Sequence, residues 1–177
     1  MADKKKTPSP QRRRRTPAQA AQSTQNAQQP MQRAGDPPAI ESATVPRTLF
    51  AAPIAVRWRD LDAFNHVNNS NFLTYIEEAR LQWLKNVPGP WFHAHSMPVL
   101  AAAELNYRAP IAWPASIAVE LSCERVGNSS ITLGHRIIDV NEPQKVYCDG
   151  RSVLVWTDPA TGQSVALPEA IRTACAM

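Results

Sequence analysis

The sequence predicts a single, mostly antiparallel α+β domain in which one long helix lies on one face of one sheet. Two observations carry this prediction. One amphipathic run is followed by four strand-like runs with no helical pattern between them, which excludes a parallel βαβ sheet. The chain also has 177 residues, which suffices for one ordinary domain and is short for two.

Residues 1–47 differ from the rest of the chain in composition. They carry nine Lys and Arg against three acids, seven of the sixteen prolines and no aromatic residue. Such a segment buries too little apolar surface to offset its ordering entropy, so we expect a disordered basic tail followed by a folded domain at 48–177. The tail is either a solvated extension or a tether to an anionic surface. Specific nucleic-acid binding is not expected, because no aromatic side chain can stack on bases there.

The folded part opens with IAVRWRD, residues 54–60, which alternates apolar and polar side chains like a half-buried strand. A second stretch places apolar residues at helical spacing: Phe72, Ile76, Ala79 and Trp83. This spacing predicts a helix of about four turns with a broad apolar face and an N-cap at Asn69 or Ser70. The segment VPGP at 87–90 ends the helix, because proline cannot continue it.

Four later runs are rich in β-branched and aromatic residues and are predicted as strands: 99–111, 116–126, 129–140 and 145–158. Turn-forming segments separate them, and a DPATG turn precedes a short C-terminal piece to which we assign no element. The predicted order is therefore strand, helix and four strands.

Three cysteines, Cys123, Cys148 and Cys175, are scattered without a metal-ligand spacing. We interpret them as reduced thiols of a cytoplasmic protein, with Cys123 and Cys148 as core residues rather than nucleophiles. The first thirty residues lack the apolar core of a secretory signal, and no apolar run is long enough to span a membrane. Neither a metal nor another cofactor is expected.

The stretch DLDAFNHVNNSNF, residues 60–72, concentrates polar side chains directly before the predicted helix. A helix start offers unpaired N–H groups and the positive end of the dipole, and a nearby carboxylate can activate water or attack a carbonyl. Seven residues separate Asp62 from Asn69, enough for a loop that turns the carboxylate over the helix start. On the residues alone, Asp62 is either such a catalytic acid or a turn residue that caps backbone amides.

The ordered set DLDAFNHVNNSNFLTYIEEAR, LNYRAPI and CDGRSVLVWTD resembles the hotdog-fold thioesterases of the 4-hydroxybenzoyl-CoA thioesterase superfamily. Within it, the single-domain acyl-CoA thioesterases with an HVNN segment and an EEAR helix are the nearest pattern. The resemblance covers roughly residues 53–170. It implies an antiparallel sheet wrapped around the long helix, a homodimer or homotetramer with sites between subunits, and hydrolysis of acyl-CoA to free acid and CoA. An acyl carrier protein thioesterase and a non-catalytic acyl-CoA-binding module stay open as alternatives.

The same resemblance assigns roles to residues of this stretch. It makes Asp62 the catalytic carboxylate and the backbone N–H of Asn69 the donor to the thioester carbonyl. His66, Asn65 and Asn68 are expected to support them as framework residues. Family members commonly have glycine where this chain has Asn65, and asparagine best replaces glycine in a left-handed backbone.

Several further residues carry expectations of their own. Glu77 is the alternative carboxylate, because a related branch of hotdog thioesterases uses a helix glutamate; otherwise we expect it to pair with Arg80 at i+3. Asp60 is interpreted as a turn former at the strand end. The substrate-binding candidates, which for the two aromatic residues compete with a plain core role, are Phe72, Tyr75 and Arg108.

Overall fold

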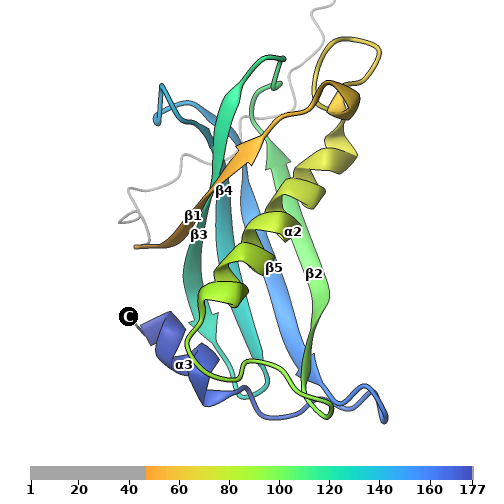
Figure 1. The fold of residues 1–177 in the computed structure, drawn as a ribbon, viewed down its shortest axis with the longest axis vertical. Coiled ribbons are helices and arrows are strands. Elements are labelled where there is room, and N and C mark those ends of the chain that lie inside the picture. Colours follow the sequence, from red (N-terminus) through yellow and green to blue (C-terminus); the bar gives the residue numbers. More distant parts are fainter. Residues whose placement is uncertain (1–46, 177) are drawn as a thin grey trace, which may run out of the picture. The chain divides into compact units, whose positions relative to one another are not determined.

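The computed structural model describes residues 47–176 of the chain (Figure 1). The predicted tail lies outside the described residues, apart from its last residue, Arg47. The elements are β1 (Thr48–Ala55), the 3₁₀ turn η1 (Trp58–Asp60), α2 (Asn69–Asn86), β2 (Met97–Tyr107), β3 (Ser116–Val126), β4 (Ser130–Asp139), β5 (Val146–Thr157) and α3 (Glu169–Ala176). Neither described helix is both long and apolar enough to cross a membrane.

The five strands form one antiparallel sheet in the order β1-β3-β4-β5-β2. The helix α2 runs across one face of this sheet, and β2 forms one of its edges (Figure 1). Strand, helix and four strands follow one another as predicted. The expected α+β architecture, a sheet wrapped around one long helix, is therefore confirmed.

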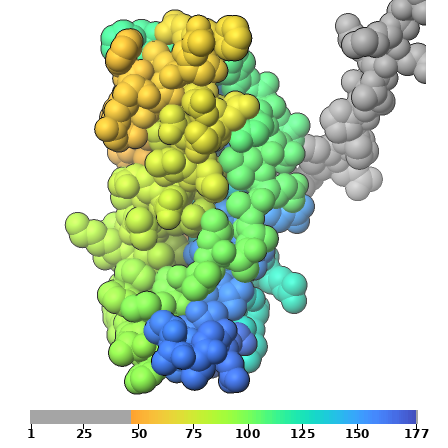
Figure 2. All heavy atoms as spheres, turned by 90° about the vertical axis from the view of Figure 1, so that its right-hand side faces the viewer, coloured from red at the N-terminus to blue at the C-terminus, as the bar shows by residue number. Residues whose placement is uncertain are grey.

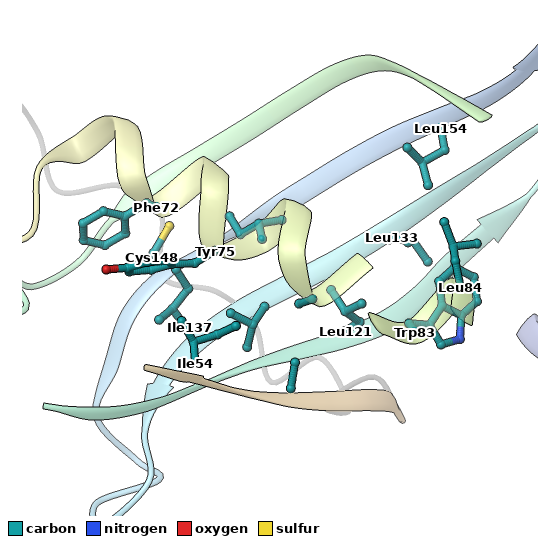
Figure 3. Close-up of a cluster of buried hydrophobic side chains, with 14 of the residues drawn as sticks. Ile54, Phe72, Tyr75, Trp83, Leu84, Leu121, Leu133, Ile137, Cys148 and Leu154 are labelled. Atoms are coloured by element: carbon teal, nitrogen blue, oxygen red, sulfur yellow. The ribbon is translucent and has the colours of Figure 1, made fainter. Parts of the chain in front are cut away.

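The core lies between α2 and the sheet. The buried residues of α2 recur every three or four positions, as one face of a helix requires: Phe72, Tyr75, Ile76, Ala79, Arg80, Trp83 and Leu84. The facing strands contribute alternate apolar residues, among them Leu121, Leu133 and Ile137 (Figure 3). Each such buried aliphatic side chain stabilises the fold by about 1.5–3 kcal/mol relative to its exposed state.

Three elements differ from the sequence-based expectation. The strand predicted over 99–111 is β2, which ends at Tyr107, so residues 108–111 are not part of it. The strand predicted over 54–60 ends at Ala55, and Trp58–Asp60 form the turn η1 instead. The turn forms because the Asp60 carboxylate accepts a hydrogen bond from the Arg57 backbone N–H at 3.0 Å, which folds the chain back on itself. The C-terminal piece forms α3, whose eight residues are shorter than the stretch over which a helical period is normally recognised in a sequence.

The start of α2 is also shifted by one residue. The N-cap is Asn68 rather than Asn69 or Ser70, and its Oδ1 accepts a hydrogen bond from the Ser70 N–H at 3.0 Å. The helix ends at Asn86, directly before VPGP, as predicted. Asn69 is therefore the first helical residue.

A buried polar cluster joins α2 to the sheet. Arg80 is 5% exposed, and its Nη1 donates to Ser152 Oγ at 3.1 Å. The same Oγ lies 3.5 Å from Nδ1 of the buried His135. The predicted ion pair between Arg80 and Glu77 is not formed, because Arg80 lies on the buried side of α2 and Glu77 on the exposed side.

This cluster predicts an acid-sensitive stability. Burial and the neighbouring charge of Arg80 lower the pKa of His135 to about 4 from its ordinary value near 6.5. The folded protein binds a proton at His135 less tightly than the unfolded chain does. The stability that the protein gains from a neutral His135 is therefore complete above about pH 6.5 and is lost as the pH falls towards 4. The unfolding free energy falls by about 3 kcal/mol between these two pH values.

Urea unfolding at a series of pH values between 7 and 4 checks this expectation. His135→Leu should remove most of the fall in unfolding free energy over that range. The control His93→Gln, on an exposed loop histidine, should retain it. An equal fall in wild type and His135→Leu would assign the acid sensitivity to other groups.

Candidate active site

The end of β1 is tied to α2 through the carboxylate of Asp60, which is 2% exposed. It accepts hydrogen bonds from Arg57 Nε at 3.0 Å and from the buried Tyr75 hydroxyl at 2.8 Å. Burial raises the pKa of Asp60, but the hydrogen bonds from Arg57 and Tyr75 outweigh it, so the pKa lies below the usual range. Its own carbonyl oxygen accepts from Asn71 Nδ2 at 2.9 Å and from the Asn68 N–H at 2.8 Å. Asp60 is thus a structural anchor, in line with its interpretation as a turn former.

Asp62 organises the loop that follows. Its Oδ1 accepts hydrogen bonds from the backbone N–H groups of Phe64 at 2.8 Å and His66 at 3.2 Å. Its Oδ2 accepts no hydrogen bond from the residues that the structure describes. One oxygen of the carboxylate therefore holds the loop, as a turn residue would, while the other is available to a bound molecule.

The tight turn of this loop depends on Asn65. Its φ is +61°, the one positive value among the described non-glycine residues. Asparagine tolerates this left-handed conformation better than other side chains that have a Cβ. The expectation that Asn65 replaces the glycine usual at this position is confirmed for its backbone conformation.

The first turn of α2 lies beside this loop. Asn68 caps the helix, while the N–H of Asn69 has no acceptor among the described residues. An unpaired N–H at a helix start carries the positive end of the helix dipole and is suited to bind an anion or a polarised carbonyl. Asn68 is therefore a capping residue, and Asn69 supplies a free donor.

Loop and helix start open into one pocket of about 270 Å³. Five predicted site residues line it: Asp62, His66, Asn69, Phe72 and Arg108. The backbone holds this side of the pocket together, since the Val67 N–H donates to the Ile111 carbonyl at 2.8 Å. The structure thus brings the candidate carboxylate and the candidate donor to the wall of a single cavity.

Tyr107 also lines the pocket and was missed in the sequence. It is the last residue of β2 and half exposed, and its hydroxyl donates to the Asn69 carbonyl at 3.2 Å. Its ring packs edge-to-face on Phe72, with centroids 5.1 Å apart. Its position in the motif LNYRAPI, directly before Arg108, was the signal that could have found it.

Of the remaining candidates, Arg108 lines the pocket, whereas Tyr75 and Glu77 do not. Arg108 Nε donates to Asp149 Oδ2 at 2.7 Å and Nη2 to Oδ1 at 3.0 Å, a bidentate pair that raises the pKa of Arg108. Tyr75 is 2% exposed, is bound to Asp60 and does not line this pocket. Burial, with this hydrogen bond, raises its pKa. Glu77 is exposed on α2 and does not line the pocket either.

Comparison with known proteins identifies the family. The family model described as the thioesterase-like superfamily matches residues 56–175, which contain the whole pocket. The chain belongs to the thioesterase-like superfamily. This membership makes the protein a thioesterase, a hydrolase of thioester bonds.

Individual relatives agree with the superfamily assignment. The chain is 29% identical over 121 residues to the long-chain acyl-CoA thioesterase FadM of Escherichia coli K12, covering 67% of this chain and 91% of FadM. A proposed acyl-CoA thioesterase from Xanthomonas campestris is 44% identical, with a TM-score of 0.62 over 68% of this chain and 99% of that one. A thioesterase from Thermus thermophilus, complexed with coenzyme A and Zn, is 32% identical, with a TM-score of 0.61 over 72% and 92% of the two chains.

The different roles of Asp60 and Asp62 in this thioesterase can be tested by measuring the stability of substituted proteins. Asp60→Asn should lower the unfolding free energy by about 1–3 kcal/mol, because the buried Tyr75 hydroxyl and the Arg57 side chain both lose their charged acceptor. Asp62→Asn keeps an Oδ1 acceptor for the loop and should change it by less than about 1 kcal/mol. Urea unfolding of both variants near pH 7 measures the difference, and equal losses would contradict the division into a structural anchor, Asp60, and a carboxylate with one free oxygen, Asp62.

Proposed function

We propose that this thioesterase hydrolyses acyl-CoA, with Asp62 as the catalytic carboxylate and the backbone N–H of Asn69 as the donor to the thioester carbonyl. The observation that carries the proposal is the shared pocket, in which both groups lie on one wall. The choice of coenzyme A as the thiol rests on similarity to acyl-CoA thioesterases. The similarity to FadM, a long-chain acyl-CoA thioesterase, favours long acyl chains.

The carboxylate acts through its free oxygen. Oδ1 of Asp62 is held by two backbone N–H groups, which restricts the side chain at the pocket that it lines. In this mechanism Oδ2 is the proton acceptor. Oδ2 takes a proton from a water molecule as its oxygen attacks the thioester carbonyl carbon. His66 lines the same wall and fixes Asp62 through its own backbone N–H, which makes it a framework residue in this mechanism.

The helix start stabilises the charge that develops. When water attacks, the carbonyl oxygen becomes an oxyanion, and the N–H of Asn69 donates to it with the dipole of α2 behind it. Collapse of the tetrahedral intermediate breaks the carbon–sulfur bond and releases the CoA thiolate and the free acid. The hydrogen bond from Tyr107 to the Asn69 carbonyl holds this first helical residue in place.

The acyl chain and the thiol portion bind on different sides of this centre. Val67, Phe72 and Ala109 supply the apolar part of the pocket wall and suit the first carbons of the acyl chain. Arg108 keeps its charge in the pair with Asp149 and lies at the same pocket, where it can attract the phosphates of coenzyme A. Phe72 and Arg108 are therefore retained as substrate-binding residues, whereas Tyr75 supports Asp60.

The active unit is proposed to be a homodimer joined at β2. This edge strand pairs with β5 on one side, and no other described strand pairs with its second side. Its exposed large apolar side chains include Met97, Val99 and Leu100, and Figure 2 shows β2 (green) at the surface beside α2. An exposed apolar edge strand of eleven residues is suited to pair with a second copy of the chain. Such a copy would also cover the open side of the Asp62 pocket.

The catalytic roles are tested on a panel of acyl-CoA substrates of increasing chain length, with the released thiol as readout. Asp62→Asn should lower kcat/KM by roughly 100-fold to 10,000-fold for every hydrolysed substrate, because the proton acceptor is lost. The matched variant Glu77→Gln, on the exposed side of α2, should retain activity within about threefold. An acyl group on acyl carrier protein serves as the competing substrate.

Two outcomes would overturn this assignment. If Asp62→Asn and wild type released thiol at the same rate while Glu77→Gln was inactive, the helix glutamate would be the carboxylate. If acyl-CoA of every length bound without hydrolysis while acyl groups on acyl carrier protein were hydrolysed, the assignment of coenzyme A as the thiol of the substrate would be wrong. Multiple turnover in ¹⁸O-water tests for direct attack by Asp62, since an acyl–Asp62 anhydride that water opens at the aspartate Cγ would leave the label in that side chain.

The dimer is tested by light scattering coupled to size-exclusion chromatography. Leu100→Lys places a charge on the exposed apolar edge and should shift the protein to a monomer with reduced thioesterase activity. The control Val126→Lys changes an apolar residue of comparable exposure at the end of β3 and should remain dimeric. A monomeric wild type would refute the β2 interface.

A further inference from the structure

Two of the three cysteines meet at the opposite end of α2 from the Asp62 pocket. Cys123 belongs to β3 and Cys175 to α3, 52 positions later in the chain. Both line one pocket of about 420 Å³, together with Trp83 and Val87 at the C-terminal end of α2. The helix α3 packs on β3, which brings the two sulfur atoms to the same wall.

The exposure of the three thiols separates this pair from the third. Cys123 and Cys175 are partly buried at the edge of the core, where small molecules in the pocket can reach them. Cys148 is 0% exposed and lies under α2 (Figure 3). The core role expected for Cys148 is confirmed, whereas Cys123 is only partly buried and packs at the edge of the core.

The two sulfur atoms are also chemically distinct. The two thiols line the same pocket, and the interaction with Cys175 lowers the pKa of Cys123. The same interaction, with burial, raises the pKa of Cys175. Because the thiolate is the attacking form, Cys123 is the nucleophile of the pair and Cys175 the resolving thiol.

We propose that Cys123 and Cys175 form a dithiol–disulfide site that exchanges with low-molecular-weight disulfides such as oxidised glutathione. The Cys123 thiolate attacks one sulfur of the small disulfide, forms a mixed disulfide and releases one small thiolate. The Cys175 thiol then loses its proton and attacks the Cys123 sulfur, which releases the second small thiol. In sum, the two protein thiols are oxidised to one disulfide and the small disulfide is reduced to two thiols.

The oxidised form ties the last helix to the sheet. A bond between Cys123 and Cys175 closes a loop that contains β4, β5 and α3, and such loops stabilise a fold chiefly by restricting the unfolded chain. We expect the thermal midpoint to rise by roughly 5–10 °C on oxidation. Asp62 and Asn69 lie at the other end of α2 and line a separate pocket, so the inference does not depend on the proposed substrate.

The experiment treats the full-length protein with oxidised glutathione and maps its tryptic peptides without reduction. Trypsin places each cysteine in a separate peptide: Cys123 in 109–125, Cys148 in 146–151 and Cys175 in 173–177. The expected product is peptide 109–125 joined to peptide 173–177, reversed by dithiothreitol. Cys175→Ser should instead accumulate a mixed disulfide on Cys123, and Cys148→Ala should still form the joined peptide.

Thermal unfolding of the oxidised and reduced forms provides the second measurement. The oxidation-dependent rise should occur in wild type and in Cys148→Ala and be absent from Cys123→Ser and Cys175→Ser, each compared with its own reduced form. Separate glutathione adducts on Cys123 and Cys175 in the wild type, with no joined peptide, would overturn the proposal. So would joined peptides that contain Cys148 as often as Cys175, or resistance of all three thiols to the oxidant.

Discussion

The buried carboxylate of Asp60 is the constraint on which the rest of this structure depends. It receives Arg57 from the end of β1 and Tyr75 from the second turn of α2, so strand and helix meet at one pair of oxygen atoms. The backbone carbonyl of the same residue fixes the helix start through Asn68 and Asn71. The loop between Asp60 and Asn68 is therefore clamped at both ends, which leaves Asp62 little freedom to move away from the helix start.

Much of the fold could be predicted because burial imposes periodicity. The apolar stripe of α2 and the alternation in β3, β4 and β5 repeat over ten or more residues, and such signals survive local exceptions. Short elements carry no comparable signal. The turn η1 depends on one carboxylate–amide contact, and α3 buries two side chains, so neither could be recognised without knowing what packs against it.

Site residues could be predicted from the sequence only where their role depends on the conformation of the neighbouring backbone. Asn65 in a left-handed turn and an aspartate near the helix start follow from the conformational preferences of those residues and from the motif they form. Contacts across the sheet do not follow from sequence: Tyr107 reaches Asn69 from the far end of β2. The interior position of Arg80 likewise depends on Ser152, 72 residues away, which accepts its hydrogen bond.

The length of α2 separates the pocket of Asp62 and Asn69 from the pocket of Cys123 and Cys175. Its 18 residues span about 27 Å. Asn69 lies in the first turn, and Trp83 and Val87, which line the pocket of Cys123 and Cys175, lie at the C-terminal end. A helix packed along its length against a sheet does not pass a local loop change from one end to the other. The segments after Asn86 and after Thr157 can therefore accept insertions and deletions while the pocket of Asp62 and Asn69 keeps its geometry.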